Sequence, residues 1–273
     1  MSAHATSSLA LAPHRIGAMV LRYLYLLRSS WSRILELIYW PAVQMLMWGF
    51  LQLYVSQNAG FFARAGGVFI GSVLLWDILF RGQLGFSISF LEEMYARNLG
   101  NIMMSPLRPV EFIAALMIMS IVRLSIGMIP VTFLAIAFFG FNLWALGFAL
   151  AAFFLNLILT SWSIGIFVAG LLLRNGLGAE SMAWTIMFLF LPLTCVYYPV
   201  TVLPDFLQYV AWALPPTYVF EGMRALLIDH VFRADLMLEA LAFNVVLFAA
   251  ASLAFLKLLR SARAQGSLLQ TSE

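Results

Sequence analysis

Long apolar runs separated by short polar segments dominate this chain and predict a bundle of membrane-spanning helices. Most runs hold about 20 residues or more, which is enough for a helix to cross a hydrocarbon core roughly 30 Å thick. We expect six spans, at residues 35–55, 67–91, 112–139, 143–173, 180–198 and 238–259. The predicted fold class is therefore an all-α polytopic membrane protein with six transmembrane helices.

Two turns interrupt this pattern. Gly140-Phe141-Asn142 predicts a tight turn, so we expect the span at 143–173 to be the antiparallel neighbour of the one at 112–139. Residues 203–214 and 218–231 are apolar but, at about 18–20 Å as helices, too short to cross. Pro215-Pro216 prevents their fusion into one straight helix. We expect residues 203–231 to form an outer hairpin that lies in the interface or re-enters the membrane.

A basic segment precedes the first span. Arg15, Arg22 and Arg33 are separated by 7 and 11 residues, which returns each to nearly the same side of a helix. This spacing suits an interfacial helix over residues 15–33, with its arginines toward anionic lipid head groups. An ordinary basic flank of a span explains the same residues, and both interpretations stay open at this point.

Composition and charge then orient the bundle. Charged residues make up only 10% of the 273 residues, against roughly 25% in soluble domains, and the mean hydropathy is +0.96. Basic residues gather on one side if the N-terminus is inside, as the positive-inside rule requires. They are Arg15, Arg22, Arg28, Arg33, Arg97, Arg108, Arg174, Lys257, Arg260 and Arg263. Both termini are therefore expected in the cytoplasm, and the net charge of +3 needs no nucleic-acid partner.

The domain organisation follows from the same pattern. We find no internal repeat, so residues 1–263 are expected to form one transmembrane domain, followed by a short cytoplasmic tail at 264–273. Residues 1–14 lack the basic-then-apolar order of a cleaved signal peptide, so the first span is expected to serve as the insertion signal. The lone Cys195 excludes a disulfide framework and a cysteine-based metal site.

The segment Glu92–Glu111 is the most charged internal stretch of the chain. Tyr95, Arg97, Leu99, Ile102 and Met103 suit a short amphipathic helix parallel to the membrane, and Ser105-Pro106 ends it. A short helix held between two spans transmits a push from a partner that is not lipid. A plain cytoplasmic loop would need neither the apolar content nor the bracketing prolines.

The same segment matches a protease signature. Glu92-Glu93 and Arg97 fit the E-E-x-x-x-R pattern of intramembrane glutamic proteases. Such chemistry needs a carboxylate to activate water and histidines to help bind the oxyanion. No histidine lies in any of the six expected spans, and His230 lies alone in the outer hairpin. The match is therefore interpreted as a coincidence, and the protease remains only a remote alternative.

Several other polar and aromatic residues are candidates for a pore or gate. Asp77 and Arg81 are four apart, so they share a helix face and can pair toward the interior; a structural pair and a pore-facing pair both remain open. Arg123 is expected to face another span or subunit, with Glu93 as a candidate partner. The full set of candidate pore or gate residues is Asp77, Arg81, Trp76, Trp162, Tyr218, Glu221 and Arg224. For Glu221 and Arg224, a local salt bridge that anchors the hairpin is favoured over a gate.

Two segments resemble one known family. Glu92-Glu93, Arg97 and then Met-Ser-Pro-Leu-Arg-Pro-Val-Glu-Phe at 104–112 resemble the loop after the second span in type 2 ABC transporter permeases. Leu214–Leu227 is similar to the family's segment before its last span. The resemblance implies a dimer of permeases in a bacterial inner membrane, with a separate ATPase subunit bound at a coupling loop over 92–109. It assigns the coupling role to Glu92, Glu93, Arg97, Asn98, Met104, Ser105 and Pro106.

The sequence contains no P-loop motif that could bind a nucleotide. That device needs a Gly-rich turn followed by Lys and Ser or Thr, and the single lysine, Lys257, stands in Phe-Leu-Lys-Leu. We therefore expect no enzyme activity and no cofactor on this chain, with ATP and Mg bound by the partner. The resemblance implies export of a glycan, lipid or drug. An ion-gradient-driven secondary transporter, which usually shows inverted repeats, and a non-transporting membrane anchor are the alternatives.

Overall fold

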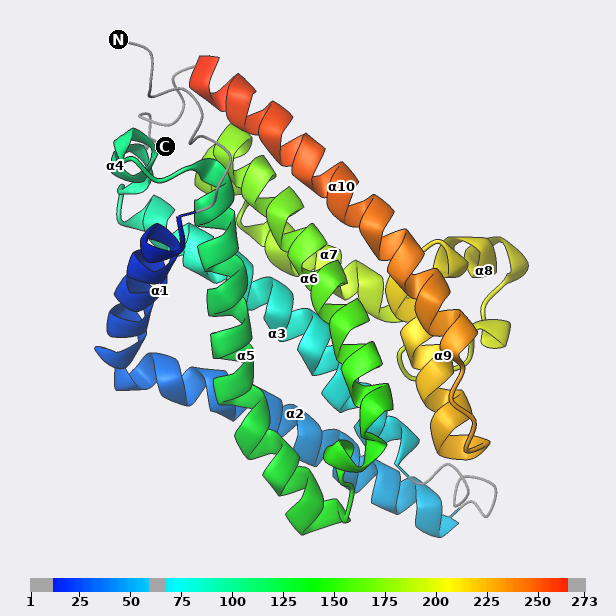
Figure 1. Ribbon diagram of the computed structural model, residues 1–273. Coiled ribbons are helices and arrows are strands. Elements are labelled where there is room, and N and C mark those ends of the chain that lie inside the picture. The colour runs from blue at the N-terminus through cyan, green and yellow to red at the C-terminus, as the bar shows by residue number, and fades with distance from the viewer. Residues whose placement is uncertain (1–11, 59–66, 265–273) are drawn as a thin grey trace.

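The computed structural model describes residues 12–58 and 67–264, and within these ranges every regular element is a helix (Figure 1). The tail predicted at 264–273 lies outside them except for its first residue, and so do residues 59–66 between the first two expected spans. The α-helices are α1 (Pro13–Arg28), α2 (Trp31–Asn58), α3 (Val68–Tyr95), α4 (Leu99–Met104), α5 (Pro109–Phe139), α6 (Phe148–Asn175), α7 (Ser181–Leu193), α8 (Asp205–Trp212), α9 (Pro215–Ile228) and α10 (Ala234–Ala264). Short 3-10 turns are η2 (Leu143–Leu146), η3 (Gly176–Ala179) and η4 (Val200–Val202).

Five of these helices are long and apolar enough to cross a membrane: α2, α3, α5, α6 and α10. They coincide with five of the six expected spans. The span expected at 180–198 is shorter than predicted, because α7 ends at Leu193, directly after Pro192. Its 13 residues measure about 20 Å at a 1.5 Å rise. The chain then turns at Cys195, whose φ is 54°.

Prolines place several helix boundaries. Pro13, Pro109 and Pro215 each stand at the first residue of a helix, where the missing N–H costs nothing. Pro215 thereby separates α8 from α9, as expected for the outer hairpin. Pro41 instead lies inside α2 and removes the hydrogen bond that the Leu37 carbonyl would accept.

Helix α3 is the centre of the bundle. It packs against α5, α6, α2 and α9. Within its apolar stretch of 18 residues, 83% of the residues are buried inside the chain. Small residues permit these close contacts, as at many helix interfaces in membranes. A Cβ added at Gly85 would lie 3.1 Å from the Ser120 Cα of α5, and one at Gly82 would lie 2.8 Å from the Ser161 Oγ of α6.

The prediction that the fourth span reverses direction after the third is confirmed, but the prediction that the two pack side by side is wrong. Helix α6 runs back from the turn after α5, but its main partners are α3 and α10. The turn at Gly140, with φ 65°, sets the reversal of the chain, whereas the buried residues on α3 decide where each helix packs.

A buried polar cluster joins α6 to α10. Thr160 Oγ1 is 2.7 Å from Asn244 Oδ1, and the Asn244 side-chain amide donates to the Asn156 carbonyl at 3.0 Å. The Asn156 amide donates in turn to the Ala152 and Met237 carbonyls. Because all three side chains are buried and hydrogen-bonded, the cluster fixes the register of the two helices.

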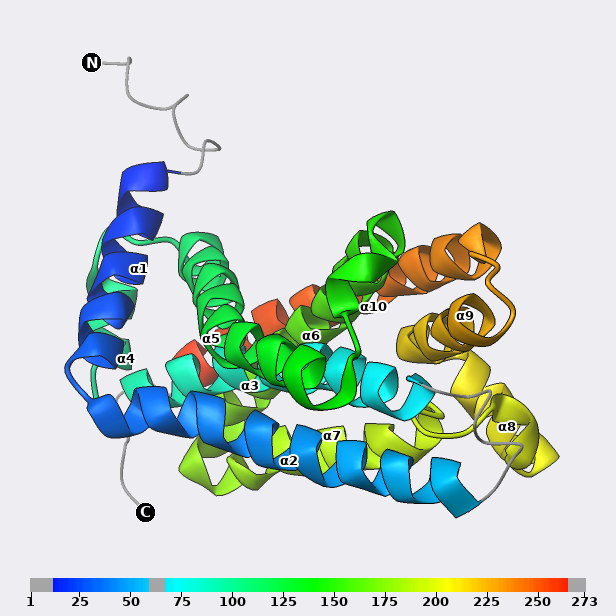
Figure 2. The same cartoon turned by 90° about the horizontal axis from the view of Figure 1, so that it is seen from below.

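The two ends of the bundle differ. Figure 1 shows α1 and α4 at one end, and α8 and α9 at the other. In Figure 2, α2 and α7 run along the same face, with α1 turned sharply away from α2. Helices α2 and α10 have large exposed apolar faces. In the apolar 18-residue stretch of each helix, only 17% of the residues are buried within this chain.

Candidate functional site

The loop predicted to couple the chain to a partner contains a short helix, as the sequence indicated. Its boundaries differ from the expectation, since Tyr95 is the last residue of α3 and Arg97 adopts a left-handed turn with φ 51° before α4 begins. Leu99 and Ile102 are buried against the bundle. At the other end Ser105 is extended with ψ 165° and stops the helix.

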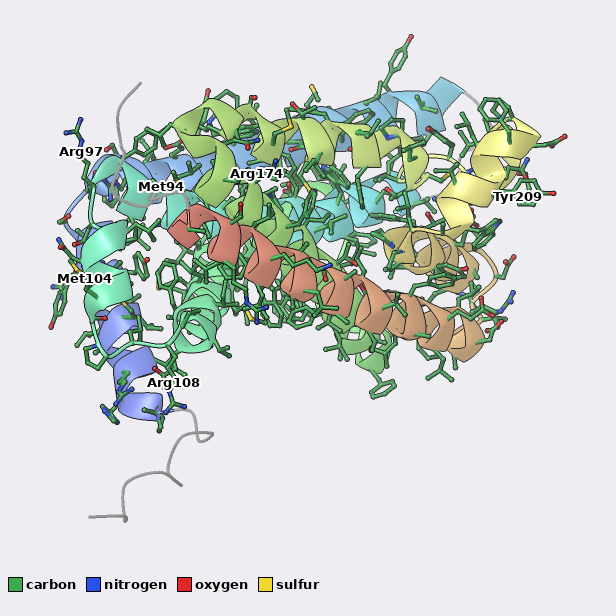
Figure 3. All side chains as sticks on the ribbon, turned by 90° about the horizontal axis from the view of Figure 1, so that it is seen from above. Met94, Arg97, Met104, Arg108, Arg174 and Tyr209 are labelled. Atoms are coloured by element: carbon green, nitrogen blue, oxygen red, sulfur yellow. The ribbon has the colours of Figure 1, made fainter. Side chains whose placement is uncertain are left out.

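The outer side of this loop is open to solvent. Arg97, Ser105 and Pro106 are exposed, and Met104 is 75% exposed. Figure 3 shows Arg97 and Met104 pointing away from the body of the protein at this end. Four of the seven predicted coupling residues therefore lie on one free surface, which we call the loop surface: Arg97, Met104, Ser105 and Pro106.

Glu93 points the other way and is 1% exposed. Its Oε1 atom forms an ion pair with the Arg22 guanidinium of α1, and its Oε2 accepts a hydrogen bond from the Asn98 side-chain amide at 2.9 Å. Partial burial opposes the charge on Arg22, but the hydrogen bond and the attraction of Glu93 outweigh it and raise the pKa of Arg22. Burial, followed by the negative charge of Glu93, also raises the pKa of the neighbouring Tyr23 hydroxyl.

Glu92 bridges two further helices. Its Oε2 is 2.7 Å from Arg123 Nη2 of α5, and its Oε1 is 3.4 Å from Arg33 Nη1 of α2. The expectation that Arg123 pairs with Glu93 is therefore wrong by one residue. The two adjacent carboxylates point to different sides of α3, so they pair with different arginines.

Glu111 completes the network at the start of α5. It accepts backbone hydrogen bonds from Ala12 at 3.0 Å and from Arg108 at 2.9 Å. Arg15 of α1 donates to the Pro106 carbonyl at 2.7 Å and lies 3.7 Å from Glu111. Helix α1 is thus attached to both ends of the coupling loop.

The arginines of the basic segment consequently do not have the partners that their spacing first suggested. The single helix expected over 15–33 is wrong, because α1 ends at Arg28 and Arg33 lies on α2. Arg15 and Arg22 of α1 and Arg33 of α2 meet Glu111, Glu93 and Glu92 of the same chain. Each arginine keeps between 34% and 45% of its side chain exposed. The acidic residues Glu92, Glu93 and Glu111 are the partners of these arginines, where one of the two open interpretations had placed lipid head groups.

A second loop on the same side approaches the first. The Tyr95 hydroxyl donates a hydrogen bond to Glu180, which lies between η3 and α7. Sequence analysis did not identify this contact, because the two residues are 85 positions apart. Figure 3 shows Arg174, at the end of α6, near the same end of the bundle as Met94.

The candidate residues within the spans are mostly internal. Asp77 and Arg81 pair as predicted, with 3.3 Å between Asp77 Oδ1 and Arg81 Nε, and Asp77 is fully buried. Both Asp77 oxygens nevertheless lack a hydrogen-bond partner among the described residues. Trp76 is buried beside Phe80, and Trp162 donates to Ser120 Oγ at 2.8 Å. Trp76 is therefore part of the packed interior around α3, and Trp162 joins α6 to α5.

The candidate residues at the outer end form an anchor. Arg224 pairs with Glu221 at 2.9 Å and donates to the carbonyls of Cys195 and Val196, while Glu221 accepts from the Val200 backbone. These bonds tie α9 to the segment after α7. The favoured interpretation of this pair as a structural salt bridge agrees with the contacts. Tyr218 is buried against Trp212 and Phe243.

The site thus contains residues that were predicted and residues that were missed. Missed were the roles of Arg22 and Glu180, which bond the coupling region from distant parts of the chain, and of Glu111, which accepts from the Ala12 backbone. Three acidic residues in the segment 92–111 and three arginines at helical spacing in the segment 15–33 were the available signal.

One comparison with known proteins bears on this geometry. The sequence model of the family described as ABC-2 type transporter matches residues 22–228. The match begins within α1 and ends with α9, so it contains the coupling loop and the outer hairpin. No curated protein sequence matches the chain.

Proposed function

Because the chain belongs to the ABC-2 type transporter family and is a transmembrane permease subunit, we propose that it works in an ATP-driven exporter. Two copies form the substrate path, and each binds a separate ATPase subunit, which carries the ATP and Mg. Members of the family typically work with such a partner. The substrate is a glycan, a lipid or a drug.

The observation that carries this proposal is the division of the loop into two sides. Glu92, Glu93 and Asn98 face inward and bond α1, α2 and α5 or the loop itself. The loop surface of Arg97, Met104, Ser105 and Pro106 faces outward. A partner that pushes on the outward side therefore moves α1, α3 and α5 together, because the ion pairs and hydrogen bonds join them.

We further propose that six segments cross a bacterial inner membrane, with both termini in the cytoplasm. Helix α7 and the residues up to Tyr198 form the fifth crossing. Two features support this topology: α4 and α8 lie at opposite ends of the bundle (Figure 1), and the basic residues gather at the α4 end. The single domain at 1–263 and the outer hairpin at 203–231 follow from the same arrangement.

The test is to replace outward residues of the loop surface in the co-purified complex. Arg97→Glu combined with Met104→Glu is expected to weaken ATPase binding by about tenfold or more, because a desolvated interface rejects unpaired charge. Tyr209→Ala, at the opposite end in Figure 3, is the control and is expected to bind the ATPase normally.

Intact ATPase binding and transport in the double variant would refute the coupling role. Uptake by the chain alone in liposomes, driven by an ion gradient without any ATPase, would establish the secondary transporter instead. Both assays use folded protein that elutes as the wild type does, so loss of folding is not mistaken for loss of coupling.

A further inference from the structure

A cavity of about 690 Å³ lies at the outer end of the chain, between the start of α3, the end of α8, α9 and the start of α10. Its polar and aromatic lining comes from Tyr197, Trp212, Glu221, Arg224, Asp229 and Arg233. The other described lining residues are apolar. Sites for small molecules typically have about this volume and this mixture of an apolar wall with a few fixed polar groups.

The charges of the cavity compensate one another. Arg224 pairs with Glu221 at 2.9 Å, and Arg233 donates to both carboxylate oxygens of Asp235, at 2.9 and 3.1 Å from its Nε. Asp229, at the end of α9, has no ion pair among the described residues. The four charged lining residues, Glu221, Arg224, Asp229 and Arg233, carry two charges of each sign, so the net charge of the lining favours neither a free anion nor a free cation.

The Glu221–Arg224 pair is rigid and retains some hydrogen-bonding capacity. Arg224 is 7% exposed and uses Nε, Nη1 and one N–H of Nη2 for Glu221 and two backbone carbonyls. A guanidinium has five N–H donors, so these contacts leave one on Nη2. Glu221 Oε2 accepts only the Arg224 Nε bond among the described contacts. The pair thus retains one donor and one acceptor with capacity for a further bond, and both residues line the cavity, which suits a hydroxyl group because a hydroxyl both donates and accepts.

The aromatic residues add flat apolar surfaces. Trp212 lines the cavity and is held by Tyr218, with 4.9 Å between ring centroids and 61° between the ring planes. Tyr197 stacks on Trp48 at 4.5 Å, which fixes its ring while one face stays free of that stack. Rigid aromatic rings next to fixed polar groups bind ligands that are polar at their edges and apolar on their faces.

From this combination we propose that the cavity binds a neutral, hydroxyl-rich ligand of one or two sugar rings. Ring faces lie against Trp212, hydroxyls exchange hydrogen bonds with Glu221 and Arg224, and Asp229 accepts a further hydroxyl. The ligand is either a free saccharide or a sugar unit of a longer glycan. This site goes beyond the proposed function and does not depend on ATPase coupling.

The experiment measures binding to the purified full chain in phosphatidylcholine nanodiscs without any ATPase. Maltose and lactose are the neutral probes, glucosamine, glucuronic acid and phosphocholine the charged ones, and saturation-transfer NMR with titration is the readout. We expect the neutral disaccharides to bind with millimolar or tighter dissociation constants. Asp229→Ala and Trp212→Ala are each expected to weaken binding by about tenfold. The exposed α8 variant Tyr209→Ala is expected to bind as the wild type does.

The exposed position of Asp229 makes its variant safe for folding, so it tests the site even if Trp212→Ala unfolds. A maltohexaose probe separates the two sources: tighter binding than maltose indicates a longer glycan, and equal binding indicates a free saccharide. The inference is overturned if no neutral sugar binds below about 10 mM, if Asp229→Ala binds unchanged, or if a charged probe is preferred.

Discussion

Arg22 and Glu93 form an ion pair that joins α1 to the end of α3 across 71 positions of sequence. Glu93 is almost completely buried, whereas Arg22 keeps 38% of its side chain exposed. The pair therefore holds the end of α3, where the predicted coupling loop begins, against α1.

The first prediction concerns this pair. Arg22→Ala leaves the Glu93 carboxylate buried without its cation, a change that costs about 3–5 kcal/mol in fully buried pairs. Because Arg22 is partly exposed and screened by water, we expect a smaller loss of about 1–2 kcal/mol in the free energy of unfolding. Thermal unfolding of the purified protein measures it.

Arg28→Ala is the matched control, since Arg28 is an exposed arginine of the same helix. It is expected to unfold like the wild type. If both variants were equally stable, the pair would contribute nothing to holding α1.

A second prediction concerns the contact of α2 with α5. Pro41 frees the Leu37 carbonyl, and a Cβ added at Gly127 of α5 would lie 2.6 Å from that oxygen. Gly127→Ala is expected to push the two helices apart and to cost about 1–3 kcal/mol. Resistance to unfolding by detergent checks the change. Gly178→Ala, where a Cβ meets nothing within 4 Å, should be neutral, and equal effects of the two variants would contradict the packing argument.

A third prediction concerns the polar cluster between α6 and α10. Asn244→Ala removes the partner of Thr160 and of the Asn156 carbonyl. Side-chain hydrogen bonds in membrane proteins average about 0.6 kcal/mol, with a maximum near 1.7, so we expect a loss of about 1–2 kcal/mol. The neighbouring Val245→Ala, 61% exposed, is the control in the same unfolding assay. A double-mutant cycle with Thr160→Val should show coupling, and strict additivity would count against a shared network.

A fourth prediction separates the two roles left open for Asp77 and Arg81. Arg81→Met alone leaves a buried carboxylate without its cation and is expected to destabilise strongly, whereas Asp77→Asn with Arg81→Met should recover most of the stability. Transport by the folded double variant then decides the role. Transport at the wild-type rate identifies a structural pair, and loss of transport in a stable protein identifies a group on the substrate path.

Sequence analysis located most of the helices because apolar length and proline positions are local signals. The five long spans, the short helix before Ser105 and the break at Pro215 all follow from neighbouring residues. The length of α7 was not predicted, since residues 194–198 carry no charge that would mark the end of a span, but the chain turns at Cys195, whose carbonyl accepts from Arg224. The partner of α6 was likewise decided by α3 and α10, not by the tight turn.

The sequence by itself determined that this is a membrane protein of long apolar helices, with one polar loop between two of them. Only the tertiary structure decided which side of that loop is exposed. Glu92 and Glu93 are identical residues that the sequence does not distinguish. On a helix, however, successive side chains point about 100° apart. One carboxylate therefore meets Arg123 and Arg33, the other meets Arg22, and the surface of Arg97 and Met104 is left free.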